Sequence, residues 1–169
     1  MGNLRSNSNE ETRETKRVTK SIYSAKAFIE ATKEFIEENF SALAEIEDDI
    51  KTDLLLLINA ELAAKFYKEL LKQVYGESFL TLRFSTDEDA IRLTITSKSP
   101  LILKSPNELI RLSRNAGFEL YPMDNGLILT ISSPKDAALS VYAISAKKAI
   151  ITLKQIFSDV FFSEMKTDE

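Results

Sequence analysis

The segment from residue 53 to residue 76, DLLLLINAELAAKFYKELLKQVYG, decides how the rest of the chain is interpreted. Its stretch over residues 54–62 is too apolar for a half-exposed surface helix, and Gly76 is a typical residue just past a helix end. We therefore expect one buried helix here. It carries two polar residues, Asn59 and Glu61, and the question is whether they belong to a chemical site.

Upstream of this segment, apolar residues from Val18 to Ile46 recur at the spacing of one face of a helix, and charged residues occupy the opposite face. This pattern predicts a long amphipathic helix. A short break at residues 47–49 separates it from the helix quoted above. Two neighbouring helices with a short connection form an antiparallel hairpin, so we expect a helical hairpin over residues 17–76.

Downstream, the apolar period changes from helical to alternating. The stretches FLTLRFS (79–85) and IRLTIT (91–96) predict two paired strands with one apolar face. The turn dipeptide Asn125-Gly126 predicts a second hairpin, and Pro122 places its first strand at or near a sheet edge. A four-stranded, mainly antiparallel sheet over residues 77–132 follows.

One helix is inserted in this sheet and another follows it. Ser105 as N-cap, Pro106 at the first helical position, Glu108 in a capping box and Gly117 as the stop predict a helix over 105–116. A second Ser-Pro start predicts a long C-terminal helix over residues 133–163. The expected order is α-α-β-β-α-β-β-α, a single α+β domain over 17–163 with polar tails at 1–16 and 164–169.

Composition excludes several classes of function. The chain has 169 residues, a formal net charge of −4, no cysteine and no histidine. The missing cysteine excludes disulfides and thiol catalysis, and the missing histidine removes the usual proton shuttle, the commonest metal ligand and any phosphohistidine relay. We expect no metal, no cofactor, no nucleic-acid partner, no membrane association and a cytoplasmic location. Gly2 and Ser6 fit an N-myristoylation pattern, but so short a pattern also recurs by chance.

Part of the chain resembles the histidine-kinase-type (GHKL, or Bergerat) ATPase fold that sensor kinases and gyrase share. The stretches INAELAAKFYKEL (58–70), RLTITSKSP (92–100) and NELIRLSRNAGFELYPMDNGLILTI (107–131) resemble its acidic helix, its strand before the adenine box and its final helix and hairpin. The hairpin before them resembles the dimerisation hairpin of sensor kinases, without its histidine. The resemblance covers about half of the chain and is one of topology more than of motifs.

The chain departs from this family where the family's chemistry lies. Glu61 stands at the position of the family's Glu, but Lys65 stands where the magnesium-binding Asn belongs. Ser-Lys-Ser-Pro at 97–100 replaces the Asp and the glycines of the adenine box, and the glycine-rich lid motif is missing. The resemblance therefore implies a degenerate domain. Its only nucleotide-pocket candidates are Glu61 and Lys65.

These two residues also have a structural interpretation. Glu61, Lys65, Lys68 and Lys72 lie on one side of a helix, as in a solvated stripe, and we favour this interpretation over a surviving nucleotide pocket. Asn59 lies on roughly the opposite side and is best explained as a hydrogen-bonded core amide or as a register-setting contact between helices.

The apolar surface of the helices points to contacts with proteins. The first and last expected helices carry more apolar face than one small sheet can cover, so we predict a homodimer through them. The candidate partner-contact residues are Arg111, Arg114, Tyr142, Phe157 and Phe161. We interpret the chain as a non-catalytic regulatory or scaffolding protein that binds protein partners. The alternative is a divergent nucleotide-binding ATPase or kinase that uses Glu61.

Overall fold

The computed structural model describes residues 20–74, 79–98, 101, 103–134 and 146–167. The elements, in chain order, are β1 (Ser21–Ser24), α2 (Ala25–Phe40), β2 (Ala44–Asp49), β3 (Leu55–Ile58), α3 (Ala60–Val74), β4 (Leu80–Asp87), β5 (Ala90–Ser97), α4 (Pro106–Ala116), β6 (Glu119–Met123), β7 (Gly126–Ser132) and α5 (Ala146–Thr167). The predicted α+β class is confirmed. The expected order of elements is not.

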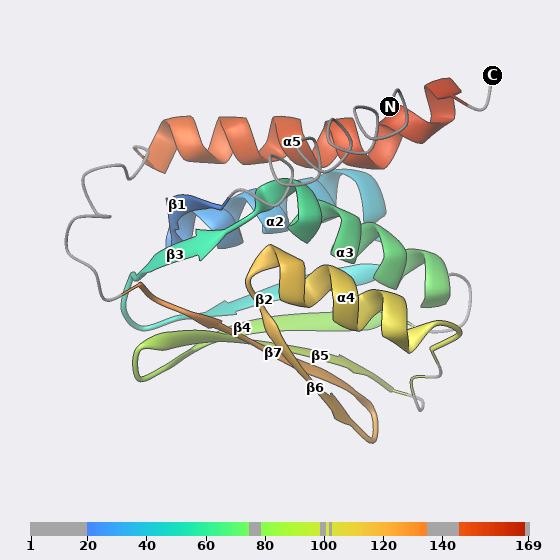
Figure 1. Ribbon diagram of the computed structural model, residues 1–169, viewed down its shortest axis with the longest axis horizontal. Coiled ribbons are helices and arrows are strands. Elements are labelled where there is room, and N and C mark those ends of the chain that lie inside the picture. Colours follow the sequence, from blue (N-terminus) through green and yellow to red (C-terminus); the bar gives the residue numbers. More distant parts are fainter. Residues whose placement is uncertain (1–19, 75–78, 99–100, 102, 135–145, 168–169) are drawn as a thin grey trace, which may run out of the picture.

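The elements stack in layers (Figure 1). A five-stranded sheet in the order β2-β4-β5-β7-β6 forms the base, and β1 pairs with β3 in a separate two-stranded sheet. Helices α2, α3 and α4 lie on one face of the large sheet, and α5 crosses α2 and α3 on the side away from it. The helices α3, α4 and α5 therefore meet at one side of the molecule.

The large sheet is mixed, which corrects the prediction of four mainly antiparallel strands. The pairs β4–β5, β5–β7 and β6–β7 are antiparallel as expected, but a fifth strand, β2, pairs in parallel with β4. The predicted alternation is confirmed in β4 and β5, since the side chains of Leu80, Leu82, Phe84, Ile91, Leu93 and Ile95 are buried under the helices.

The predicted long first helix is wrong. Ser24 ends β1 and caps α2, because its Oγ accepts a hydrogen bond of 3.0 Å from the main-chain N–H of Ala27. The helix ends at Phe40, and from Ala44 onward buried and exposed residues alternate as in a strand. Ile46 fits the helical and the strand period equally well, so periodicity alone did not reveal the change.

The quoted segment is also not one helix. Residues 55–58 form β3, and α3 begins only after Asn59. The Asn59 Oδ1 accepts a hydrogen bond of 2.9 Å from the N–H of Leu62, so Asn59 is the N-cap of α3. Within the described residues 20–74, the helical hairpin predicted over 17–76 is therefore absent, and Gly76, the expected helix end, lies outside them. The prediction that Asn59 is a buried, hydrogen-bonded amide is confirmed, because it is 4% exposed.

The inserted helix and the second hairpin are confirmed. Gly117 ends α4 with φ 108°, a left-handed conformation that suits glycine, and β6 and β7 pair antiparallel. The turn between them is at 124–125 and not at the predicted Asn125-Gly126, because Gly126 already pairs with Met123 in the sheet and has no positive φ. Pro122 lies in β6, at the sheet edge as predicted. The predicted capping box does not form, because the Ser105 side chain makes no cap bond and the Glu108 carboxylate pairs with Arg111.

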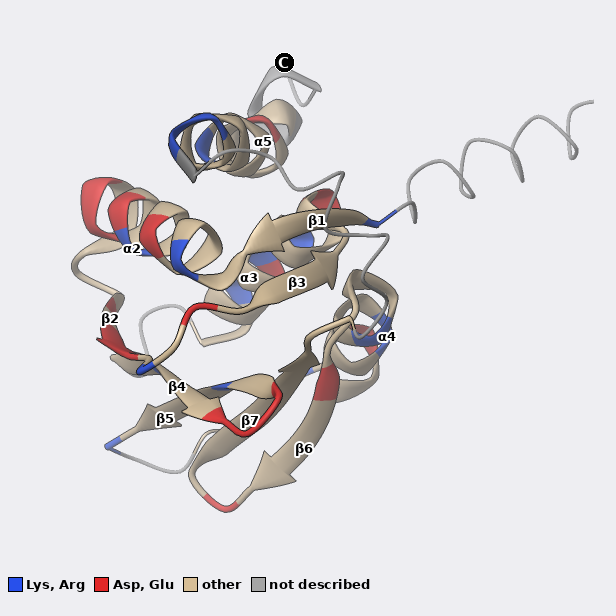
Figure 2. Ribbon diagram, turned by 90° about the vertical axis from the view of Figure 1, so that its left-hand side faces the viewer, with Lys and Arg blue, Asp and Glu red and all other residues tan. Residues whose placement is uncertain are grey.

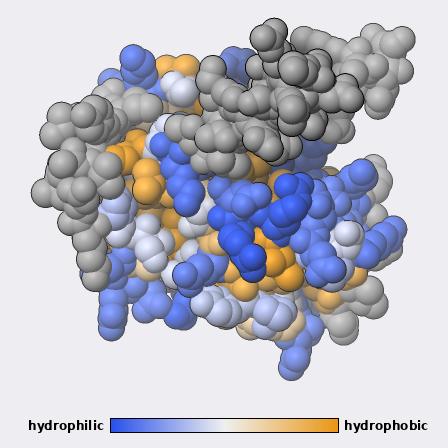
Figure 3. Space-filling view, in the orientation of Figure 1, coloured by the Kyte–Doolittle hydropathy of each residue, from blue (hydrophilic) through white to orange (hydrophobic). Residues whose placement is uncertain are grey.

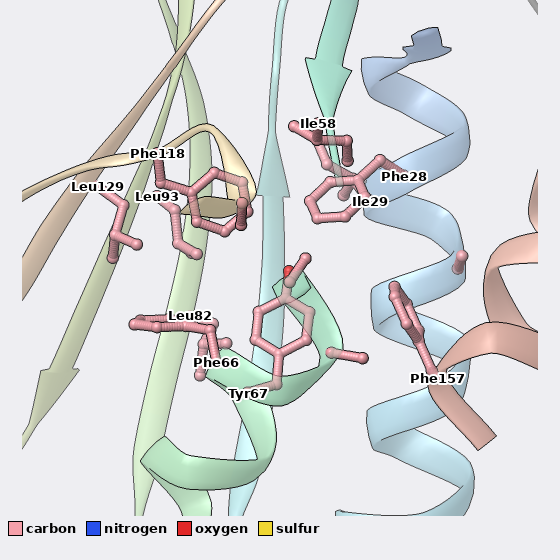
Figure 4. Close-up of a cluster of buried hydrophobic side chains, with 14 of the residues drawn as sticks. Phe28, Ile29, Ile58, Phe66, Tyr67, Leu82, Leu93, Phe118, Leu129 and Phe157 are labelled. Atoms are coloured by element: carbon pink, nitrogen blue, oxygen red, sulfur yellow. The ribbon is translucent and has the colours of Figure 1, made fainter. Parts of the chain in front are cut away.

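Helix α5 completes the core. Phe28 of α2 lies at the centre of an aromatic cluster, with its ring centroid 6.3 Å from those of Phe84, Phe118 and Phe157 (Figure 4). Since Phe157 comes from α5 and is fully buried, α5 belongs to the domain. The helix is described from Ala146 and continues to Thr167, past the expected end at 163. The expected start at Ser133-Pro134 leads into residues 135–145, which lie outside the described residues, as does the tail 1–16.

Two linked, buried hydrogen bonds through Thr32 join α2 to α3 beside this cluster. The Thr32 Oγ1 donates to the Phe28 carbonyl at 2.9 Å and lies 3.2 Å from the Tyr67 hydroxyl. Because the Thr32 hydroxyl has one proton and gives it to Phe28, Tyr67 is the donor in the second bond. Burial raises the pKa of Tyr67, so the phenol stays neutral and keeps its proton for this bond.

Candidate functional site

An open groove of about 720 Å³ runs between α3, α4 and α5. Three helices contribute to its walls, and most of the side chains are charged. The lining residues are Glu61, Lys65, Lys68, Glu69 and Lys72 from α3, Glu108, Arg111 and Leu112 from α4, and Ile156, Asp159, Val160 and Ser163 from α5. Figure 3 shows hydrophilic side chains gathered over α3 and α4 beside hydrophobic surface.

The α3 wall follows from the sequence of that helix. Glu61, Lys65, Lys68 and Lys72 are spaced by four, three and four residues, which places them on one side of the helix. The opposite side is buried against the core. Glu61 and Lys72 are exposed, whereas Lys65 and Lys68 are half-buried by the groove. The predicted stripe exists, and it forms the wall of a groove instead of a flat surface.

Hydrogen bonds fix the three helices around the groove. The Lys68 Nζ donates to the carbonyl of Val160 at 3.2 Å and joins α3 to α5. The Gln73 amide donates to the Ser105 carbonyl and accepts from the Ser105 N–H, each at 3.1 Å, which joins α3 to the start of α4. The walls are thus held in place within the chain, and the groove is preformed.

Several of the lining charges are paired inside the groove. The Arg111 guanidinium lies 2.6 Å from the Glu108 carboxylate, and this hydrogen bond holds the pKa of Glu108 below its usual value. Glu69 accepts a hydrogen bond from Gln73. Asp159 accepts one from Gln155. In the described part of the chain, no ion pair joins Glu61 to Lys65, although their spacing allows one.

The structure separates the predicted site residues into two groups. Glu61, Lys65 and Arg111 line the groove together. Arg114 is exposed on α4 outside it. Phe157 is fully buried and Phe161 is 7% exposed, so these two side chains pack inside the chain. Tyr142 lies outside the described residues.

Sequence reasoning missed the contribution of α5 to the groove. Ile156, Asp159, Val160 and Ser163 share one side of that helix, and this spacing is visible in the sequence. What the sequence does not show is that this side faces α3. Among the described residues, no group of three or more Asp or Glu is placed to hold a metal ion, and no described helix is long and apolar enough to cross a membrane.

No protein-family model matches the sequence, and no curated protein matches it. Among solved structures, the chain is similar to the catalytic domain of the histidine kinase ThkA, with a TM-score of 0.48 and 10% identity over 69% of this chain and 97% of that one. The cytoplasmic segment of the histidine kinase QseC gives a TM-score of 0.45 at 10% identity, over 69% and 74% of the two chains. The histidine kinase domain of the Escherichia coli osmosensor EnvZ gives 0.46 at 11% identity, over 69% and 90%.

These comparisons describe a similarity of fold to segments of histidine kinases at low sequence identity.

Proposed function

We propose that this chain is a non-catalytic regulatory or scaffolding protein, located in the cytoplasm, that binds a partner protein in the groove between α3, α4 and α5. The observation that carries the proposal is the composition of the groove. The groove is preformed and open, and its lining combines charged side chains of both signs with apolar residues from α4 and α5. Interfaces between proteins likewise combine apolar and charged surface.

Of the apolar lining residues, Leu112 is 5% exposed and Val160 is 9% exposed, so the fold already buries them. Ile156 is half-buried and offers most of the apolar surface that a partner side chain can still cover, which is favourable at about 25 cal/mol per Å². The charged side chains of the lining then set which partner is accepted, because unmatched charges in an interface are costly.

The chemistry of Glu61 and Lys65 supports a binding role over catalysis. Glu61 is exposed on the groove wall, and general-base catalysis requires a substrate held within hydrogen-bond reach of such a group. The Lys65 ammonium offers only N–H donors, so it cannot ligate a magnesium ion. In an open groove, both side chains are suited to pair with opposite charges on a partner protein.

A second candidate is nucleotide binding, and one observation favours it. A volume of about 720 Å³ falls within the range of small-molecule sites, and three lysines and one arginine line the groove. Phosphate groups could meet these cations. This candidate predicts saturable binding of ATP or ADP that depends on Glu61, which a titration measures directly.

The proposed function is tested by cross-linking in cells. A photo-reactive amino acid replaces Ser163, which is exposed and lines the groove, or Asn39, which is exposed on α2 outside the groove. We expect at least one protein that cross-links from position 163 and not from position 39, and that is lost when Lys65→Glu is added. Equal cross-linking from both positions, or none from position 163, contradicts the proposal.

A further inference from the structure

The charges that line the groove differ in whether the chain itself satisfies them. Lys68 and Arg111 have partners within the chain, as described above. Lys65 and Lys72 make no ion pair and no hydrogen bond with any other part of the described chain, and neither does Glu61. On the α3 wall, the charged side chains without a partner in the described chain are therefore two cations, Lys65 and Lys72, and one anion, Glu61, at the start of the helix.

These three residues have a fixed spacing. Lys65 and Lys72 are seven residues apart on α3, which corresponds to about 10 Å along the helix axis. Glu61 lies about one turn before Lys65, toward the N-terminus of the helix. A ligand that satisfies both lysines needs two anionic groups about 10 Å apart, and it avoids a negative charge beside Glu61.

From this arrangement we propose that the groove accepts an acidic segment of another protein, an inference that rests on the proposed function and names the class of partner. Two carboxylates of the segment meet Lys65 and Lys72, and an apolar side chain of the segment covers Ile156, the half-buried apolar residue of the lining. The required spacing corresponds to positions i and i+7 of a helix or i and i+3 of an extended segment. Glu61 sets the direction, because it favours a basic residue at that end.

A peptide suits this groove better than a uniform polyanion does. Glu61, Glu69, Glu108 and Asp159 also line the groove, and a nucleic acid would bring a phosphate close to them at each step along its backbone. A peptide can place its carboxylates at two points and apolar or basic side chains elsewhere. The formal net charge of −4 likewise gives no general attraction to nucleic acid.

A second copy of the chain is the other source of an acidic segment. Acidic positions follow α2 and β2 on another side of the molecule (Figure 2). Several of them already have partners within the chain, since Lys154 of α5 lies 3.7 Å from Glu34 and 2.9 Å from Glu38, and Arg83 lies 2.7 Å from Asp49. We therefore assign the groove to a different protein, and self-association through Lys65 and Lys72 is an outcome that the experiment recognises.

The experiment selects displayed random peptides of about 16 residues on the full chain. Peptides whose binding is blocked by Ser163→Trp, which fills the groove without changing charge, define the groove binders. Their affinities are measured by calorimetry for the wild type and for Lys65→Glu/Lys72→Glu. The matched control is Lys26→Glu/Lys33→Glu, which makes the same charge change at the same spacing on α2, outside the groove.

We expect groove binders with two carboxylates at the stated spacing, at least tenfold weaker binding to Lys65→Glu/Lys72→Glu, and unchanged binding to the α2 control. Replacing the two peptide carboxylates by lysine should restore binding to the charge-reversed variant. Groove binders that lack acidic residues and ignore the charge reversal overturn this inference and leave the proposed function standing. The absence of any binder blocked by Ser163→Trp overturns both. A dimer of the chain that Lys65→Glu/Lys72→Glu dissociates overturns the assignment to a different protein.

Discussion

At the scale of single residues, Asn59 shows how one side chain sets the boundary between a strand and a helix. Its Oδ1 caps α3 through Leu62, and its main-chain N–H donates to the carbonyl of Ala116 at 2.9 Å, which ties the start of α3 to the end of α4. The walls that α3 and α4 contribute to the groove therefore both depend on Asn59. Asn59 therefore has a structural role at the junction of β3, α3 and α4.

The cap gives a direct prediction. Asn59→Ala removes the acceptor for the Leu62 N–H, and loss of an N-cap typically costs about 1 kcal/mol. We expect the free energy of unfolding to fall by about that amount or more, since the site is buried, and Asn59→Asp to lose less because it keeps the acceptor. Urea denaturation measures both. As a control, Asn39→Ala, on the exposed surface of α2, should change stability by less than about 0.5 kcal/mol. Equal effects at both positions would contradict the assignment of the cap.

Single residues also show which part of the groove could be predicted from the sequence and which could not. The stripe of Glu61, Lys65 and Lys72 followed from helical spacing alone, because these residues lie on one element. The partners across the groove come from α5, and Asp159 is far from them in the chain. Spacing within one helix cannot show which distant helix it faces, so the groove itself was not predictable.

At the scale of elements, strong local signals predicted the second half of the chain and weak ones failed in the first. The dipeptide Asn125-Gly126 marks the second hairpin, which is confirmed although its turn lies one residue earlier, at 124–125, and the Ser-Pro start at 105–106 marks the inserted helix, which is also confirmed. In contrast, four consecutive apolar residues at 55–58 suit a buried strand and a buried helix equally. The long-range pairing of β3 with β1 decides between the two, and periodicity does not contain this information.

Helix α5 allows a prediction at this scale. Phe157 is fully buried between α2 and α3, and its ring centroid lies 5.8 Å from that of Phe35 and 5.9 Å from that of Tyr67. Phe157→Ala leaves a cavity in this cluster, so we expect a loss of about 3 to 5 kcal/mol in the free energy of unfolding.

The control is Lys148→Ala on the same helix, which is exposed and should change stability by less than about 0.5 kcal/mol. Thermal or urea denaturation of the two variants gives the comparison. If Phe157→Ala unfolds like the wild type, α5 is not docked on the domain as described, and the groove loses one of its walls.

At the scale of the whole molecule, the fold accounts for the apolar faces from which a homodimer was predicted. Helices α2 and α5 pack against each other within one chain, so Phe161 is unavailable as a contact with a second copy. The homodimer stays a prediction, and on α5 we place its contact at Ile151, which is 70% exposed. Light scattering should give twice the chain mass, and Ile151→Asp should give the monomer mass. A monomer for the unsubstituted chain would contradict this prediction.

The central claim is that the groove binds protein and does not serve a nucleotide enzyme. Isothermal titration of the full chain with ATP and with ADP, each in the presence of magnesium, tests it most directly, with Glu61→Ala as the matched variant. We expect no saturable binding up to about 1 mM for either protein, because Lys65 cannot ligate magnesium and Glu61 stands in an open groove. Saturable binding below about 100 μM that Glu61→Ala abolishes would contradict the claim and establish the nucleotide alternative.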